Sequence, residues 1–317
     1  MDNTQLNMTF EEAKELVLSY KERTGKSQSA IATELGVSGG QLSSFLSGNY
    51  KAPHTLIPKI SALLEINEKK EIAPKEPEFV ETTVSRDVMN AIAYSHVQGK
   101  ISVVYGDAGI GKTMAIREYC RKNNLAIYIT ISPAYASMSG VNDLIADRLG
   151  VRERVSRKIY IEIISKLKGS GRVLIIDEAQ HLTVRTLNHI RCMADESGIG
   201  ICLIGNDEVY SKLKGSGRAD FAQLFSRIGT RKQVLTSTLS REDIDSVFSV
   251  VEDSEARNIL FKISRTNYGL RGAVNVFVNT AAVYKTVEPS GLARMIKEMN
   301  IGNVGVGLWE RQERTPL

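Results

Sequence analysis

The residues best suited to chemistry lie in one glycine-rich stretch, Gly106–Thr113. Its sequence, Gly-Asp-Ala-Gly-Ile-Gly-Lys-Thr, fits the pattern G-x-x-x-x-G-K-[ST] of a phosphate-binding loop. Backbone N–H groups of such a loop point at phosphate oxygens, and the N-terminus of the next helix adds positive potential. Lys112 is predicted to reach the β- and γ-phosphates of a nucleotide, and the Thr113 hydroxyl to bind Mg²⁺. The residues expected to contact the nucleotide are Gly106, Asp107, Ala108, Gly109, Ile110, Gly111, Lys112, Thr113 and Met114.

The flanks of this loop have the order that a phosphate site requires. The apolar run Ile101–Tyr105 predicts a buried strand before it, and Met114–Cys120 predicts a helix after it. The alternative is a chance glycine turn in front of a helix.

A second feature is a pair of carboxylates at the end of the apolar run Val173–Ile176. Asp177 and Glu178 follow it directly, at the carboxyl end of a predicted strand, where ligands bind in open α/β sheets. Asp177 is predicted to hold Mg²⁺, directly or through water, and Glu178 to orient and deprotonate an attacking water. Two solvated acids at a strand end are the alternative.

Asn206 ends a third apolar run, Ile199–Ile204, after a glycine. From a neighbouring strand, its side chain could hydrogen-bond the attacking water or the γ-phosphate. A simple turn asparagine is the other interpretation.

The remaining pattern indicates how these residues are positioned. Nearly continuous apolar runs alternate with helical patterns, as in a parallel sheet covered on both faces. From Ser237 onward only helical patterns follow. Strands are expected at Ile101–Tyr105, Ala126–Ile131, Val173–Ile176 and Ile199–Ile204.

The first part of the chain predicts a helix-turn-helix module. Ser27–Leu35 and Gly39–Leu46 are helical patterns separated by a glycine turn. Gln41 and Ser44, near the start of the second helix, could contact DNA phosphates or base edges. Because this module has no basic surplus, a protein-interaction bundle is the alternative.

The expected fold class is therefore α/β, with a P-loop parallel sheet and a C-terminal helical lid, preceded by an all-α helix-turn-helix domain. The predicted domains are the helix-turn-helix at 1–66, a flexible, charged, proline-bearing linker at 67–81, an ATPase core at 82–235, the lid at 236–300 and a tail at 301–317.

Composition sets broad limits on the class of protein. The chain has 317 residues, a net charge of +5 and a pI near 9.0, which weakly favours a polyanionic partner. No apolar run is long enough to span a membrane, and no secretory signal is visible, so a cytoplasmic protein without a membrane partner is expected. The 3 cysteines have no metal-ligand spacing.

The three motifs together resemble Walker A, Walker B and sensor 1 of the AAA+ ATPases. The sequence Asp177-Glu-Ala-Gln-His-Leu182 resembles the branch that contains transposition ATPases. The domain order, with short signatures such as Leu224–Ile228, is similar to the Mu B-like transposition regulators, a family of target-capture ATPases. The resemblance spans nearly the whole chain. It implies ATP and Mg²⁺ as ligands, and the cytoplasm of a bacterial or phage-infected cell as the location.

The same resemblance implies roles for two arginines. Arg227 resembles an arginine finger that completes the site of a neighbouring subunit, with Arg231 as a competitor one helical turn away. Arg271, in Tyr268-Gly-Leu-Arg-Gly, resembles the sensor 2 residue of the lid. An arginine acting in trans requires head-to-tail contacts, which give rings or helical filaments. A solvated surface charge is the alternative for each arginine.

Basic residues gather in two parts of the predicted core. Some are expected to follow the backbone of double-stranded DNA, without direct sequence readout, and solvated helix faces are the alternative. The first group contains the DNA-contact candidates Arg152, Arg154, Arg157 and Lys158. The second group contains Lys212, Lys214, Arg218 and Lys232.

The leading functional hypothesis is an ATPase that oligomerises on target DNA with little sequence preference, and delivers that DNA to a transposase and activates it. One alternative is a replication initiator or helicase loader with origin-specific binding. Another is a nucleotide-gated transcription regulator with negligible turnover. Both alternatives predict discrete binding sites, whereas the leading hypothesis predicts coverage that scales with DNA length.

Overall fold

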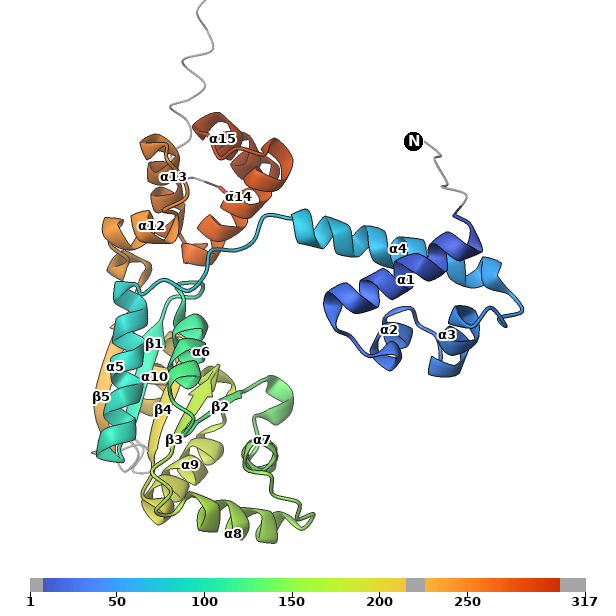
Figure 1. Cartoon of the computed structure of the whole chain (residues 1–317). Coiled ribbons are helices and arrows are strands. Elements are labelled where there is room, and N and C mark those ends of the chain that lie inside the picture. The colour runs from blue at the N-terminus through green and yellow to red at the C-terminus, as the bar shows by residue number, and fades with distance from the viewer. Residues whose placement is uncertain (1–7, 215–225, 303–317) are drawn as a thin grey trace, which may run out of the picture. The chain divides into compact units, whose positions relative to one another are not determined.

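The chain folds into two compact units, Met1–Pro74 and Lys75–Leu317 (Figure 1). The structure, a computed structural model, describes residues 8–214 and 226–302. The predicted tail beyond residue 302, Arg218 and the start of the Leu224–Ile228 signature lie outside the described residues.

The described part of the first unit, residues 8–74, forms four helices, and α2 and α3 match the two helical patterns of the predicted helix-turn-helix. A capping box formed by Thr9 and Glu12 opens its first helix, and Gly25 in the left-handed conformation ends it. Phe45 lies at the centre of the core, with its ring packed edge-to-face against Phe10 and Tyr50. The four helices are α1 (Phe10–Thr24), α2 (Gln28–Glu34), α3 (Gly39–Leu46) and α4 (Pro53–Ile72).

Helix α4 continues into the segment that we expected to be a flexible linker. Residues 67–72 are helical, and the helix ends only at Ala73. The charged residues of this stretch favour helix, and Lys69 pairs with Glu65 one turn earlier (2.6 Å). Arg23 of α1 also reaches Glu71 (3.1 Å), so these charges extend the helix instead of dissolving it.

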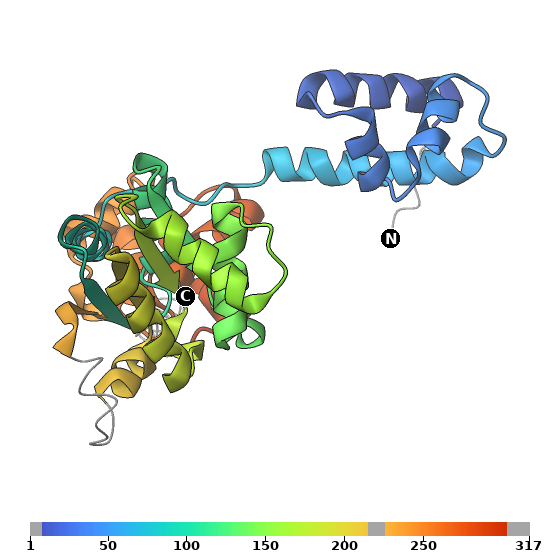
Figure 2. The same cartoon turned by 90° about the horizontal axis from the view of Figure 1, so that it is seen from below.

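The second unit is built on a five-stranded parallel sheet in the order β2-β3-β4-β1-β5 (Figures 1 and 2). The four predicted strands are present within a residue of their expected bounds, and the predicted parallel α/β fold is confirmed. The strands are β1 (Ile101–Gly106), β2 (Ala126–Thr130), β3 (Val173–Asp177), β4 (Gly200–Gly205) and β5 (Ile228–Val234).

Alternate residues of the strands face two different layers of helices. Val104 and Ile175, for example, pack against α5 and α6, whereas Val103 and Ile176 pack against the layer containing α7, α8 and α9. Figures 1 and 2 show α5 and α7–α9 on opposite sides of the sheet. These helices are α5 (Thr83–Gln98), α6 (Lys112–Lys122), α7 (Met138–Leu149), α8 (Ser156–Leu167), α9 (Val184–Ser197) and α10 (Asp207–Lys214), with 3₁₀ turns η1 (Pro133–Tyr135) and η2 (Ala179–His181).

Strand β5 is an element that the sequence pattern did not reveal. It pairs with β1 at the edge of the sheet, and only its end residues, Ile228 and Val234, are buried. Arg231 lies in the middle of this strand beside Val103. The expectation that Arg231 lies one helical turn from Arg227 is therefore wrong, because the chain is extended there.

The C-terminal helices form a region with its own core. Phe248, Leu260 and Phe277 are among the buried side chains, and Leu270 contacts both this core and the α5–α6 layer of the sheet. After the turn η3 (Thr236–Thr238), the helices are α12 (Arg241–Val247), α13 (Ser254–Ser264), α14 (Gly269–Tyr284) and α15 (Pro289–Glu298).

None of the helices within residues 8–214 and 226–302 is long and apolar enough to cross a membrane.

Candidate nucleotide site

The glycine loop lies between the end of β1 and the start of α6, as the motif predicts. Gly106 has φ 139°, and a Cβ on it would lie 1.8 Å from the carbonyl oxygen of Val234 in β5. Only glycine fits that position. Asp107 fixes the loop further, because its backbone N–H donates to Val234 O (3.1 Å) and its carboxylate accepts from the N–H of Thr236 (2.7 Å).

The loop ends at a helix N-terminus that no side chain caps. Gly111 is the N-cap residue of α6, in the left-handed conformation with φ 99°, and contributes no side-chain cap. The first N–H groups of α6 therefore remain available for an anion. Lys112 folds back, and its Nζ donates to the carbonyl oxygens of Gly106 (3.0 Å) and Asp107 (2.5 Å). Burial lowers the pKa of Lys112, and the neighbouring carboxylates, first among them Asp177, oppose that shift.

Thr113 and Asp177, the two predicted metal ligands, lie in direct contact. The Thr113 hydroxyl donates to Asp177 Oδ2 (2.8 Å), and the N–H of Glu178 donates to Asp177 Oδ1 (2.9 Å). Asp177 is only 3% exposed, and this burial raises its pKa. A hydroxyl and a carboxylate beside a phosphate loop are the hard oxygen donors that Mg²⁺ prefers, so the residues fit this ion.

Tyr128 of β2 also reaches this carboxylate, with 3.4 Å between its hydroxyl and Asp177 Oδ2. Thr130 in turn donates to the Tyr128 hydroxyl (2.9 Å). The sequence pattern showed only that Tyr128 lies in a strand, and the pairing of β2 with β3 is what brings it to Asp177.

Glu178 and Asn206 follow the carboxyl ends of two neighbouring parallel strands, β3 and β4. Glu178 has φ 56°, a left-handed conformation that L residues other than Asn and Asp rarely adopt. Asn206 Oδ1 accepts from the N–H of Glu208 (3.0 Å) and so caps α10. Gln180 contacts both segments: its amide Nε2 donates to Glu178 Oε2, and its Oε1 accepts from the N–H of Asn206 (3.3 Å).

Arg271 lies at the start of α14, directly against the glycine loop. Its backbone N–H donates to Gly109 O (2.8 Å), and its Cβ is 3.3 Å from the position that a Cβ on Gly109 would take. The guanidinium of Arg271 is exposed and has no partner among the described residues. The residue that resembles sensor 2 therefore begins a helix whose backbone is bonded to the phosphate loop.

Arg227 lies at the opposite end of the strands from the phosphate loop. It precedes β5, whose first residue is in register with Ile101 at the start of β1, whereas Val234 pairs with Gly106 at the end. Six residue steps of about 3.3 Å along β5 separate its two ends by roughly 20 Å. The Arg227 guanidinium instead pairs with Asp195 of α9 (3.6 Å). It cannot serve the phosphate loop of its own chain.

Comparison with known proteins places this geometry in a family. The family described as "AAA domain" matches residues 96–213. The Mu-like prophage FluMu DNA transposition protein B of Haemophilus influenzae is 34% identical over 254 residues, which cover 77% of this chain and 88% of that protein. The ATP-dependent target DNA activator B of Escherichia phage Mu is 35% identical over 208 residues, covering 64% of this chain and 67% of that protein.

The chain belongs to the transposition protein B family. It is an AAA ATPase, and the predicted resemblance is confirmed. Among solved structures, CDC6P from Pyrobaculum aerophilum superposes with a TM-score of 0.51 at 16% identity, covering 71% of this chain and 68% of that chain. That likeness concerns the fold alone.

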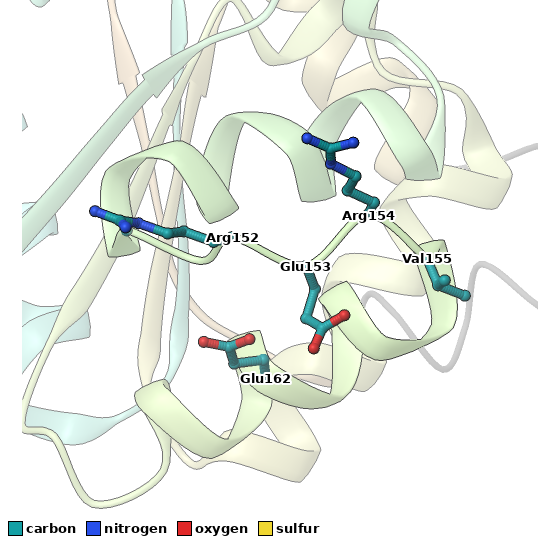
Figure 3. A pocket seen from close by; sticks show the side chains of 6 residues that line it. Arg152, Glu153, Arg154, Val155 and Glu162 are labelled. Atoms are coloured by element: carbon teal, nitrogen blue, oxygen red, sulfur yellow. The ribbon is translucent and has the colours of Figure 1, made fainter.

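In this transposition protein B relative, the four DNA-contact candidates of the core lie on α8 and the segment before it. Arg152, Arg154, Arg157 and Lys158 are all exposed, and no side-chain partner occurs for them among the described residues. Figure 3 shows Arg152 and Arg154 extending on one side of that segment, and Glu153 and Glu162 on the other. An open hollow of about 510 Å³ lies there, lined by Gly150, Arg152, Glu153, Arg154, Val155 and Glu162.

Several other basic residues are committed to contacts within the fold. Arg148 donates to Tyr128 O (3.1 Å), and Lys232 pairs with Asp87 (3.0 Å). Lys212 donates to the carbonyl oxygen of Gln180. These three side chains are thus occupied within the fold, whereas the four candidates on α8 and the segment before it are exposed and can meet an external anion.

The two candidates of the first unit differ in availability. Gln41 uses its Oε1 to accept from the N–H of Ser38, because it is part of the capping box that opens α3. Its amide NH₂ group and the second lone pair of Oε1 remain for a partner. Ser44 is half-buried on the same helix.

Proposed function

We propose that this ATPase assembles on double-stranded DNA in its ATP-bound state, with little sequence preference, and delivers that DNA to a transposase, which it activates. The supporting observation is the convergence of the phosphate loop, Asp177, Glu178 and Asn206 on one edge of the sheet, in a chain 35% identical to a protein named as an ATP-dependent target DNA activator. As part of this proposal, residues 82–235 serve as the ATPase core and residues 236–300 as its lid.

Within the site, each residue has a task that its position supports. Lys112 exchanges its loop carbonyl partners for phosphate oxygens when nucleotide binds. Thr113 and Asp177 would hold Mg²⁺, which would neutralise phosphate charge when bound. Glu178 accepts a proton from the attacking water, and Asn206 orients that water or the γ-phosphate.

Two arginines complete the proposed mechanism. Arg271 contacts the phosphates from α14, whose backbone is already bonded to the loop. Arg227 lies at the end of the strands that is remote from the phosphate loop of its own chain. It therefore acts on the nucleotide of a neighbouring subunit. Subunits linked in this way associate head to tail, as a ring or a filament.

DNA is held in this proposal by the exposed cations of α8 and the segment before it. Contacts to phosphates carry no direct sequence information, which accounts for low sequence specificity. The helix-turn-helix unit adds contacts through Gln41 and Ser44, or binds a protein partner.

The decisive experiment is electron microscopy of the chain with ATP and DNA duplexes of increasing length. Assemblies whose length follows that of the duplex are expected. Glu178→Gln, which keeps the ATP site but slows hydrolysis strongly, is expected to make them persist, and Lys112→Ala to prevent them. Monomers alone under saturating ATP would refute the assembly model.

A further inference from the structure

The short turn η2 after Glu178 is tied to the neighbouring strand and helix by one side chain and one backbone carbonyl. Gln180 donates its amide Nε2 to Glu178 Oε2 and accepts the N–H of Asn206 at Oε1 (3.3 Å). Its own carbonyl oxygen accepts from Lys212 Nζ of α10, which also reaches Leu182 O (3.5 Å). The amide is therefore a bridge between the carboxylate and the backbone that carries Asn206.

The end of β4 leaves space for this bridge. A Cβ on Gly205 would lie 2.4 Å from Gln180 Oε1 and 2.5 Å from Val209 Cγ2. Both distances are too short for a Cβ unless the Gln180 or Val209 side chain moves, so glycine leaves room for the amide in this position. Gly205 has an ordinary backbone conformation, since it is absent from the residues with positive φ. The restriction on side-chain size at this position thus comes from Gln180 and Val209 and not from a turn.

We propose that Gln180 is a positioning residue for ATP hydrolysis. By donating to Oε2, it fixes the rotation of the Glu178 carboxylate and leaves Oε1 to accept the proton of water. By accepting a hydrogen bond from the N–H of Asn206, Gln180 also fixes the distance between the Glu178 carboxylate and Asn206, the two groups proposed to contact the water. The inference rests on the proposed role of Glu178 as the base.

Gln180→Leu, which keeps the size of the side chain but neither hydrogen bond, tests this role. A general base contributes roughly 10²- to 10⁴-fold, and loss of its orientation forfeits part of that. We expect kcat to fall about 10- to 100-fold, whereas the affinity for a fluorescent ATP analogue stays unchanged. Gln180→Glu, which keeps the length and places a second negative charge against Glu178, is expected to lower kcat at least as much. It also provides the test if the leucine variant does not fold.

The matched control is His181→Ala, because His181 lies in the same turn with an exposed side chain. Its kcat should equal that of the unaltered chain. A second measurement separates positioning from general support of the fold: single-turnover hydrolysis by Glu178→Gln, with and without Gln180→Leu. If Gln180 acts through Glu178, the second substitution adds no further loss.

The outcomes distinguish the two ideas. Normal hydrolysis by Glu178→Gln would refute the role of Glu178 itself. A strongly slowed Glu178→Gln beside a fully active Gln180→Leu would overturn only the inference about Gln180. A further loss in the double variant, or an equal loss in His181→Ala, would also overturn it, because the effect would then be a disturbance of the turn.

Discussion

Gly269 lies where the C-terminal helices touch the phosphate loop, and replacing it with alanine should separate the two. It has φ 62°, and a Cβ on it would lie 2.8 Å from Ala108 O and 2.9 Å from Gly109 O. Both are backbone oxygens of the loop, which cannot rotate away as a side chain can. The start of α14 must therefore move, and the hydrogen bond from Arg271 N–H to Gly109 O (2.8 Å) is lost.

The size of the effect has two parts. The left-handed conformation costs an alanine about 1–2 kcal/mol, which corresponds to a fall in Tm of roughly 2–8 °C for a unit of this size. Displacement of α14 also moves Arg271 away from the phosphates. A hydrogen bond to a charged group is worth about 1.5–3 kcal/mol, so nucleotide affinity should fall roughly 10- to 150-fold.

The control is Gly198→Ala, at the end of α9. Gly198 has φ 74°, but nothing lies within 4 Å of a Cβ built there. It therefore carries the same backbone strain without the collision. Thermal unfolding and binding of a fluorescent ATP analogue, measured on both variants, separate the two parts. If Gly269→Ala bound nucleotide as tightly as Gly198→Ala, the contact between α14 and the loop would have no part in binding.

Three further outcomes are expected. Burial raises the folded-state pKa of Asp177 above its unfolded value, so its charge costs stability at neutral pH and the cost disappears as the pH falls through the raised pKa. Asp177→Asn should therefore raise the Tm of the ligand-free chain at neutral pH, by an amount that shrinks on acidification. The same variant should lose the Mg²⁺-dependent rise in Tm that ATP gives. A lower Tm of the ligand-free variant at neutral pH would contradict this. Mixing Lys112→Ala chains with Arg227→Ala chains should restore part of the hydrolysis that each lacks alone, since one supplies the arginine and the other the loop; no recovery at any ratio would exclude action in trans. The last prediction replaces four exposed cations with alanine: Arg152, Arg154, Arg157 and Lys158. The slope of log affinity for random-sequence DNA against log salt should then become shallower by about 3 to 4, at roughly 0.9 per phosphate contact. An unchanged slope would exclude these residues as contacts.

The sequence was sufficient for the core of the site because parallel strands end at a common edge. Once Asp177 and Asn206 were assigned to the ends of apolar strands, their nearness to the glycine loop followed from the fold class. The contact of Thr113 with Asp177 (2.8 Å) is the direct consequence.

Other features depend on pairings that a single sequence does not contain. Strand β5 has polar residues along most of its length because it pairs on one side only, at the sheet edge, so the usual apolar signal is missing. Gln180 and Tyr128 gain their significance from the order of β2, β3 and β4. The helical continuation of α4 shows that charged residues were a poor sign of a flexible linker, because Glu and Lys are good helix formers.

The phosphate loop is held from two directions, and this bears on how a bound nucleotide could control assembly. On one side, β5 ends at Val234, whose carbonyl accepts the N–H of Asp107 (3.1 Å). On the other, α14 donates to Gly109. A nucleotide that favours one shape of the loop must favour one placement of both neighbours, by as much as its affinity differs between the two shapes. Because β5 begins directly after Arg227, one strand joins the chain's own phosphate site to the arginine proposed to serve the next subunit.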